Sequence, residues 1–340
     1  MINAAVVGLG TWGKTMVESL AGSDLMRFTT LQTRTVTPDV EAFAKQHSLR
    51  IANSYEAVLA DPKIDAVALA TPPSGHLQQI QAAAGAGKHV YCEKPFTFSK
   101  KEAEAAVDAV RKAKRTVGVG YNRRFHPEMV KLHDRIRSGE LGTIQHIEAS
   151  MTYPNALFLP PTAWRSNKAE APLGGLAPMG VHAIDAMIYL TGDIETVYCQ
   201  SFARAVQNGT DDTTSMLFRM KQGMSGYLGT MTTTGAGFAF QVFGSKGWHR
   251  IEGVTHVTGA SSEERRTRQF GACKFQPVKG PLETWEAERL DIVRATFEAF
   301  ARAAEGGVPF PIPPEQIIHG ASVSEAVIRS AASGKVEKVA

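Results

Sequence analysis

The chain has 340 residues, of which 43% are hydrophobic and 21% are charged, and its formal net charge is +4 at pH 7. This length suits two globular domains. The mild net charge, with no long run of lysine and arginine, argues against a nucleic-acid partner. No apolar run approaches the roughly 18 residues of a membrane-spanning helix, and we see no signal peptide at the first residues.

The three cysteines, Cys92, Cys199 and Cys273, lie far apart in the sequence and form no CxxC motif. They therefore predict neither a disulfide framework nor a zinc site, and no other metal site is indicated. We expect a protein of the reducing cytoplasm.

Residues 1–122 alternate between short apolar runs and helical patterns. The runs predict strands near residues 2–7, 28–32, 65–70, 89–93 and 116–121. Strands that alternate with helices over short connections indicate a parallel, doubly wound sheet. We therefore expect an N-terminal Rossmann domain, an α/β fold that binds a dinucleotide.

Residues 123–340 have a different pattern, with longer β-rich runs and few helices between them. These runs fall near residues 143–152, 194–205, 212–220, 224–233 and 239–244. They predict an α+β domain with a large, open and mostly antiparallel sheet. Helical patterns cover residues 285–307 and 315–334. The last helix is a candidate for packing against the first domain.

A glycine-rich turn, Gly8-Leu9-Gly10-Thr11-Trp12-Gly13, directly follows the first predicted strand and opens a helix. In that context Gly8 permits the tight turn, Gly10 lets a pyrophosphate approach the backbone and Gly13 lets the helix pack closely. The helix N-terminus supplies N–H groups for the phosphates. An ordinary tight turn is the alternative, and we favour the dinucleotide.

The end of the second strand distinguishes NADP from NAD. An NAD site usually has an acidic residue there for the ribose 2′-hydroxyl, whereas this chain has Thr33 and Arg34. A guanidinium can form charge-assisted bonds to a 2′-phosphate. We therefore favour NADP, with NAD as the alternative if Arg34 only stacks on the adenine.

Glu93, Lys94 and Pro95 follow the fourth predicted strand, at the edge where open α/β sheets bind ligands. Pro95 restricts Lys94. A lysine held beside a nicotinamide can give or take the proton of a hydroxyl group. A surface lysine paired with Glu93 explains the same pattern, and spacing alone does not separate the two interpretations.

A second glycine-rich segment, "LGGLAPMGVHAID", spans residues 173–185 and continues into a helical pattern. His182 and Asp185 are three residues apart on that helix, so their side chains can touch. The carboxylate would then fix the imidazole tautomer and leave the other nitrogen for a substrate. A buried histidine satisfied by Asp185 is the structural alternative.

Several strings, in this order and spacing, resemble the Gfo/Idh/MocA oxidoreductases over nearly the whole chain. They are "VVGLGTWG" at 6–13, "ATPPSGH" at 70–76, "AGKHVYCEKPF" at 86–96, "GYNRRFHP" at 120–127, "SGELGTI" at 138–144, "WR" at 164–165 and the 173–185 segment. The resemblance implies a Rossmann domain followed by a large open sheet, a nicotinamide cofactor, and hydride transfer at a sugar, polyol or similar carbon. The sheet face often serves as a dimer surface in this family, which implies a homodimer or homotetramer.

Together with the residue patterns above, the resemblance gives three groups of expected site residues. The catalytic group is Lys94 with His182. The substrate-binding group adds Asn122, Arg124, Arg165 and Asp185. The cofactor-binding group is Gly8, Gly10, Thr11, Trp12, Gly13, Thr33, Arg34, Thr71, Pro72, His76, Glu93, Lys94 and Arg165.

The departure from the family pattern is Pro178, four positions before His182. Many dehydrogenase members have an aspartate there, and proline cannot handle a proton. We therefore expect an NADP-dependent oxidoreductase in which Lys94 and His182 act alone. A cofactor-bound sensor without catalysis, or an epimerase or hydrolase that recycles its bound NAD(P), is the alternative.

Overall fold

The structure is a computed structural model that divides into two compact units. The first unit comprises Met1–Asn122 and Asp291–Ile318, and the second comprises Arg123–Leu290 and His319–Ala340. The first unit thus includes residues 291–318, which the sequence analysis assigns to the second domain. The residues described are 1–160, 163–206, 209–255 and 259–340.

The first unit has a six-stranded, entirely parallel sheet in the order β3-β2-β1-β4-β5-β6. Its strands are β1 (Ile2–Val7), β2 (Met26–Gln32), β3 (Arg50–Ile51), β4 (Ala66–Leu69), β5 (His89–Cys92) and β6 (Val117–Val119). The order reverses beside β1, which is where open α/β sheets bind ligands. This confirms the predicted Rossmann-type sheet.

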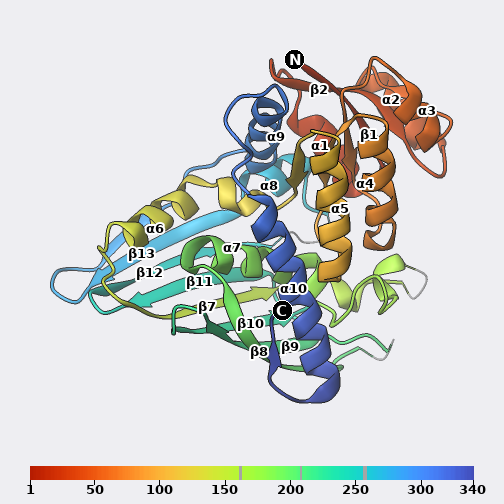
Figure 1. Cartoon of the computed structure of the whole chain (residues 1–340). Coiled ribbons are helices and arrows are strands. Elements are labelled where there is room, and N and C mark those ends of the chain that lie inside the picture. Colours follow the sequence, from red (N-terminus) through yellow and green to blue (C-terminus); the bar gives the residue numbers. More distant parts are fainter. Residues whose placement is uncertain (161–162, 207–208, 256–258) are drawn as a thin grey trace. The chain divides into compact units, whose positions relative to one another are not determined.

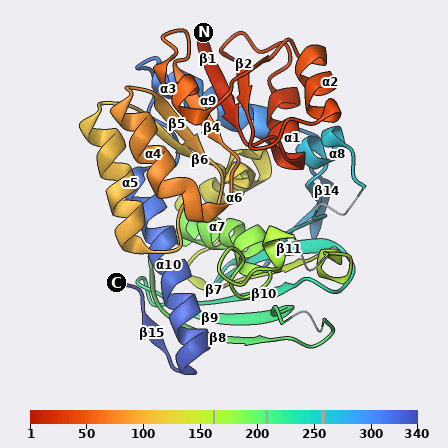
Figure 2. The same ribbon diagram turned by 90° about the vertical axis from the view of Figure 1, so that its right-hand side faces the viewer.

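Helices flank this sheet in Figure 2, with α4 (His76–Gly85) and α5 (Lys100–Lys112) on one side and α1 (Thr11–Ser19) and α2 (Pro38–Gln46) on the other. The unit also contains α3 (Tyr55–Ala60) and α9 (Ile292–Ala304). The ring of Phe297 in α9 lies 5.6 Å from that of Phe28 and 4.3 Å from that of Tyr91. Buried aromatic contacts of this kind place α9 against the Rossmann sheet although it comes late in the chain.

The second unit has a nine-stranded sheet in the order β14-β13-β12-β11-β7-β10-β9-β8-β15. Every neighbouring pair is antiparallel except β7 with β10, as the sequence predicts. The strands are β7 (Ile144–Thr152), β8 (Ile194–Phe202), β9 (Thr213–Met220), β10 (Ser225–Met231), β11 (Gly237–Gly244), β12 (Gly247–Gly253), β13 (Phe270–Pro277), β14 (Glu283–Glu286) and β15 (Glu337–Lys338).

One face of the nine-stranded sheet is buried under helices, and side chains alternate between the two faces as the pleat requires. In Figure 1, α6 (Pro127–Arg137) and α7 (Val181–Thr191) lie over the sheet. One register row under the helices is buried throughout: Cys199, Met216, Leu228, Ala149, Phe240, Ile251 and Cys273. The adjacent row on the other face is Tyr198, Leu217, Tyr227, Glu148, Gln241, Arg250 and Lys274, none of which is buried except Gln241.

The second unit also contains α8 (Ser262–Thr267) and most of α10 (Pro314–Ser333), whose first residues belong to the first unit. The hydroxyl of Ser330 in α10 accepts a hydrogen bond from the Cys199 amide at 2.9 Å, which ties the helix to β8. The expected helix at 285–307 is wrong at its start, because residues 283–286 pair with β13 as an edge strand and the helix begins only at Ile292.

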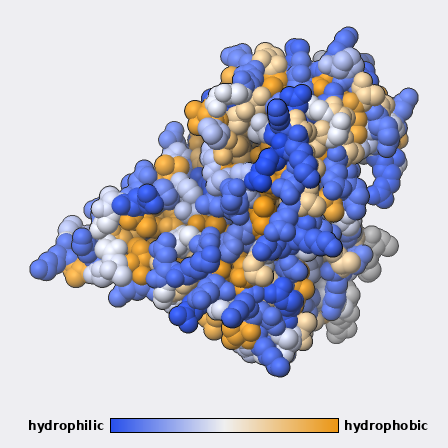
Figure 3. Space-filling model, viewed as in Figure 1, coloured by the Kyte–Doolittle hydropathy of each residue, from blue (hydrophilic) through white to orange (hydrophobic). Residues whose placement is uncertain are grey.

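Charged and polar residues are spread over the face of the molecule shown in Figure 3, with apolar residues in small groups between them. No helix in the described part of the chain is long and apolar enough to cross a membrane.

His249 lies inside the second unit, in an environment that makes the stability of the folded protein depend on pH. The side chain is fully buried on the helix-covered face, and neither ring nitrogen has a hydrogen-bond partner among the described residues. Burial lowers its pKa to about 3, and the nearby positive charges of Arg135 and Lys131 contribute to the decrease. Trp285 packs edge-on against the imidazole at 5.4 Å.

We expect the His249→Leu variant to lose less stability between pH 7 and pH 5 than the parent protein, by about 2 kcal/mol. Below the usual histidine pKa of about 6.5, the unfolded chain takes up a proton that the folded protein excludes, so acid favours unfolding. Above that pH both states are neutral and the effect vanishes. Urea unfolding at the two pH values measures the difference, and an equal loss in both proteins would contradict the assignment.

Candidate active site

The glycine-rich turn between β1 and α1 leaves room where a phosphate would approach. A Cβ added to Gly8, which has φ +94°, would lie 2.7 Å from the Ala70 carbonyl oxygen, and one added to Gly13 would lie 2.2 Å from that of Gly8. A Cβ on Gly10 would meet nothing within 4 Å. The outer two glycines are therefore required by close backbone packing, whereas Gly10 faces open space.

The N-terminus of α1 has the features of an anion site. Gly10 occupies the cap position, no side chain caps the helix, and its first turn contains no acidic residue. Gly10 and Thr11 are both exposed. The free N–H groups and the helix dipole favour negative charge there. With the space over Gly10, this turn fits the pyrophosphate of a dinucleotide.

The segment after β2 contains the residues expected to select the dinucleotide. Thr33 is half-buried and Arg34 is exposed. Within the part of the chain that the structure describes, Arg34 forms no hydrogen bond or ion pair. Its guanidinium is therefore free to bind an anion.

The residues after β4 require one correction. The Thr71 hydroxyl donates to the side-chain oxygen of Gln79 at 2.6 Å. His76 is completely buried, with one ring nitrogen 3.0 Å from the Thr71 carbonyl oxygen and the other 3.0 Å from that of Pro95. Its ring is thus occupied by backbone and not available to a cofactor, so we assign His76 to positioning the two loops.

Glu93 and Lys94 end β5 at the same edge of the parallel sheet as the glycine turn. Burial raises the pKa of the Glu93 carboxyl to about 7, while the positive charge of Lys94 acts to lower it. The carboxylate also accepts a hydrogen bond from the Lys94 backbone N–H, with an N–O distance of 3.3 Å. A Cβ on Gly120 would lie 2.5 Å from this carboxylate, so only glycine fits beside it. Lys94 itself is half-buried.

In the second unit, the 173–185 segment runs through a close backbone contact. A Cβ on Gly174, which has φ +56°, would lie 1.9 Å from the Asp211 carbonyl oxygen, and one on Gly175 would lie 2.7 Å from the Thr230 side chain. The two glycines are therefore needed for the chain to pass the ends of β9 and β10. Asp212 holds the neighbouring loop by accepting three backbone N–H groups, from Arg204, Ala205 and Val206.

Pro178 lies in a single π-helical turn, η5 (Leu176–Gly180), that leads directly into α7. The Gly180 backbone N–H donates a hydrogen bond of 2.9 Å to the Gly175 carbonyl oxygen, five residues earlier, as in a π-helix. Proline is tolerated in a first helical turn because the N–H it lacks has no partner there. This local geometry accounts for Pro178, and its side chain supplies no proton-handling group.

Asp185 binds Arg124 rather than serving as the expected support of His182. The Arg124 guanidinium donates to both carboxylate oxygens, with one Nε–Oδ2 distance of 3.2 Å, and the two side chains are only 3% and 5% exposed. Arg124 also lies over the Tyr189 ring, 4.7 Å from its centroid. Both residues were predicted to bind substrate. As a buried, bidentate pair they instead join α7 to the short helix η2 (Asn122–Phe125).

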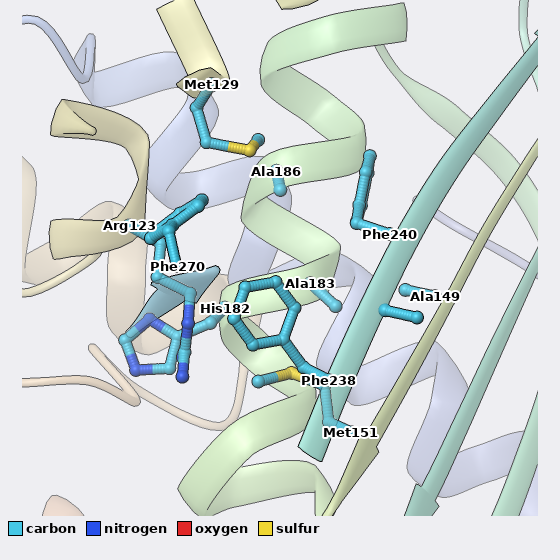
Figure 4. Close-up of a pocket in the computed structure, with 11 residues that line it drawn as sticks. Arg123, Met129, Ala149, Met151, His182, Ala183, Ala186, Phe238, Phe240 and Phe270 are labelled. Atoms are coloured by element: carbon cyan, nitrogen blue, oxygen red, sulfur yellow. The ribbon is translucent and has the colours of Figure 1, made fainter. Parts of the chain in front are cut away.

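A small, partly open pocket with a cavity volume of about 20 Å³ lies between α7, α6 and the sheet, and we call it the α7 pocket (Figure 4). Two polar residues line it, His182 and Arg123. The nitrogen atoms of both are drawn at the same end of the pocket in Figure 4. The other lining residues are apolar: Met129, Ala149, Met151, Ala183, Ala186, Phe238, Ala239, Phe240 and Phe270.

Arg123 lines the pocket although the sequence analysis does not single it out. The string "NRRF" offers two adjacent arginines, of which Arg124 is the predicted substrate-binding residue. Adjacent residues of a helical turn point in different directions, so the structure pairs Arg124 with Asp185 and gives Arg123 to the pocket. Of the remaining predicted residues, Asn122 is buried in η2, and Arg165 in η4 (Trp164–Ser166) is close enough to the buried Tyr153 to affect its ionisation.

Comparison with known proteins agrees with this arrangement. Residues 2–121 match the model of the oxidoreductase family with an NAD-binding Rossmann fold, and residues 129–250 match the GFO/IDH/MocA C-terminal domain. The rhizopine catabolism protein MocA of Rhizobium meliloti is 30% identical over 333 residues, which cover 95% of this chain and 90% of that protein. The chain belongs to the Gfo/Idh/MocA oxidoreductase family.

This Gfo/Idh/MocA protein is therefore an oxidoreductase that binds a nicotinamide dinucleotide. It is 26% identical to the 1,5-anhydro-D-fructose reductase of Ensifer adhaerens over 304 residues, 88% of this chain and 87% of that enzyme. The crystal structure of aldose-aldose oxidoreductase from Caulobacter crescentus has the same fold, with a TM-score of 0.86, 23% identity and 99% of each chain covered.

Proposed function

We propose that this protein transfers a hydride between NADP and the hydroxyl or carbonyl carbon of a sugar, a polyol or a related compound. The observation that carries this proposal is the edge of the Rossmann sheet, where the open turn at Gly10 follows β1 and the half-buried Lys94 follows β5, the two strands on either side of β4. The similarity to a reductase of 1,5-anhydro-D-fructose supports the substrate class.

The bound nicotinamide supplies or accepts the hydride. Lys94 then has the task of giving the proton to the oxygen of a carbonyl that is reduced, or of taking it from a hydroxyl that is oxidised. The Glu93 carboxylate accepts a hydrogen bond from the Lys94 backbone N–H and lies near the Lys94 ammonium. His182, at the α7 pocket, binds the same oxygen or a neighbouring hydroxyl.

Thr33 and Arg34 support NADP as the cofactor, since neither is an acid that would bind the ribose 2′-hydroxyl and repel a 2′-phosphate. The remaining cofactor contacts fall to Gly8, Gly10, Thr11, Trp12, Gly13, Thr71, Pro72 and Glu93. Arg165 is proposed to reach cofactor or substrate.

We expect Arg34→Ala to weaken NADPH binding by about tenfold to a hundredfold and to leave NADH binding within about threefold. The reason is the loss of charge-assisted hydrogen bonds to the 2′-phosphate, which are worth roughly 1.5–3 kcal/mol. Fluorescence titration of each dinucleotide measures both constants. A parent protein that binds NADH as tightly as NADPH, with an unchanged ratio in the variant, would contradict the selection of NADP by Arg34.

A screen of sugars, polyols and small ketones with NADP⁺ and NADPH tests the activity itself. Turnover is followed by the absorbance of NADPH, with the Lys94→Ala protein as the control at each substrate. A sensor would bind the dinucleotide and turn over nothing. An epimerase or hydrolase that recycles its cofactor would form product without an absorbance change.

We also propose that copies of this chain associate through the open face of the nine-stranded sheet. Leu217, which is 55% exposed, lies there between Tyr198 and Tyr227 in the register row, which gives the face an apolar centre. Exposed apolar groups of this kind mark interaction surfaces. Light scattering of the purified protein at micromolar concentration would contradict this proposal if it gave the mass of a monomer.

A further inference from the structure

The α7 pocket presents two nitrogen-bearing side chains and no acid. Arg123 and His182 are the only polar residues among the described residues that line it, and the rest of the lining is methionine, alanine and phenylalanine. Hydroxyl groups of a neutral polyol need acceptors for their hydrogens as well as donors. This lining offers very few acceptors, so it is poorly matched to a neutral polyol.

Arg123 is held in the pocket without a counter-ion. Within the described residues its guanidinium forms no ion pair, and its buried Nε has no hydrogen-bond acceptor. The guanidinium lies over the Phe238 ring, 5.3 Å from the centroid, and Phe238 in turn packs edge-on against Phe270 at 5.4 Å. Burial lowers the pKa of Arg123 to about 10, so the group is still charged at neutral pH.

A half-buried guanidinium without an anion is costly where its Nε is buried, because that atom has lost water and no acceptor replaces it. Its neighbour Arg124 shows the usual solution, a bidentate carboxylate from Asp185. The Arg124–Asp185 pair also fixes η2 against α7, and η2 carries Arg123 while α7 carries His182. The pocket therefore holds its unpaired guanidinium in a defined place.

We infer that Arg123 binds a carboxylate of the substrate, so that this enzyme acts on hydroxy or oxo acids, including sugar acids, in preference to their neutral counterparts. A carboxylate matches the planar fork of a guanidinium and restores the missing counter-charge. His182 is then left for the reacting oxygen or a neighbouring hydroxyl. This inference rests on the proposed function, because it assigns a substrate class to the same site.

Matched pairs of substrates test the inference. D-glucuronate is compared with D-glucose, and 3-hydroxybutyrate with 1,3-butanediol, in NADP⁺-linked assays and by calorimetric titration of the NADPH-loaded protein. The parent protein is expected to prefer the acid of at least one pair by tenfold or more in kcat/KM or in affinity. Arg123→Met should remove that preference, because it should lower kcat/KM or affinity for the acid at least tenfold more than for its neutral partner.

Three further variants separate charge from structure. Arg123→Lys keeps the charge but not the fork, and should retain part of the preference. Arg137→Met removes an exposed guanidinium from α6 and should behave as the parent. If Arg123→Met does not fold, Arg123→Gln replaces it. Equal losses for acid and neutral partners in the Arg123 variants, or a parent that prefers neither acid, would overturn the inference.

The two proposals fail in different ways. Acids that bind in an Arg123-dependent manner without turnover would support the carboxylate site and refute the redox activity. Turnover of neutral sugars that needs Lys94, by a parent protein with no Arg123-dependent preference for either acid, would support the activity and refute the carboxylate site.

Discussion

Replacing Lys94 by alanine will lower kcat by about 10²- to 10⁴-fold, the range that a positioned general acid or base contributes. The dissociation constant of NADPH should stay within about twofold, because the proposed site for the phosphates is the α1 turn and the proposed role of Lys94 is proton transfer. Single-turnover kinetics with saturating NADPH and a substrate from the screen separate the chemical step from binding.

Two further variants make this result specific. Lys94→Arg keeps a positive charge but cannot exchange its proton near neutral pH, so we expect it to be nearly as slow as the alanine variant. Lys101→Ala removes an exposed lysine from α5 and should retain full activity. Full activity in Lys94→Ala would rule out Lys94 as the proton donor.

Arg124→Met is expected to cost about 3–5 kcal/mol in the free energy of unfolding, the effect of breaking a buried ion pair from one side. Asp185 would stay in the interior with its counter-ion removed. Burial raises the pKa of Asp185 above its usual value even in the parent, and Arg124 acts to lower it. Urea denaturation monitored by circular dichroism measures the loss.

The double variant Arg124→Met, Asp185→Leu distinguishes a broken pair from a damaged helix. Replacing both partners by apolar residues of similar size is often neutral, so we expect most of the lost stability to return. A single variant that loses less than about 1 kcal/mol, or a double variant no more stable than the single one, would contradict this account of the pair.

Most of the first unit could be predicted from the sequence, because the motifs that specify its strands, turns and helices are short and contiguous. An apolar run followed by GxGxxG predicts a strand, a turn and a helix N-terminus. The structure explains each glycine, Gly8 and Gly13 by close packing and Gly10 by open space. His76 could not be assigned in this way, since its partners at Thr71 and Pro95 are set by the folding of two separate loops.

The second unit was less predictable. The start of the 285–307 pattern contains good helix formers, yet Trp285 and Glu286 pair with β13 as an edge strand, so tertiary pairing overrides local propensity. The adjacent Arg123 and Arg124 cannot be told apart by pattern. Which one meets Asp185 depends on the direction in which η2 presents each side chain to α7.

The central claim is that this protein transfers a hydride between its dinucleotide and a carbonyl carbon, and deuterium transfer tests it most directly. NADPH that carries deuterium at the transferable C4 position is incubated with the protein and an oxo substrate from the screen, and the product is analysed by mass spectrometry. The account predicts one deuterium on the new carbinol carbon with the parent protein and none with Lys94→Ala over the same period. A product formed by the parent protein without deuterium, or bound NADPH with no reduction of any carbonyl compound, would contradict it.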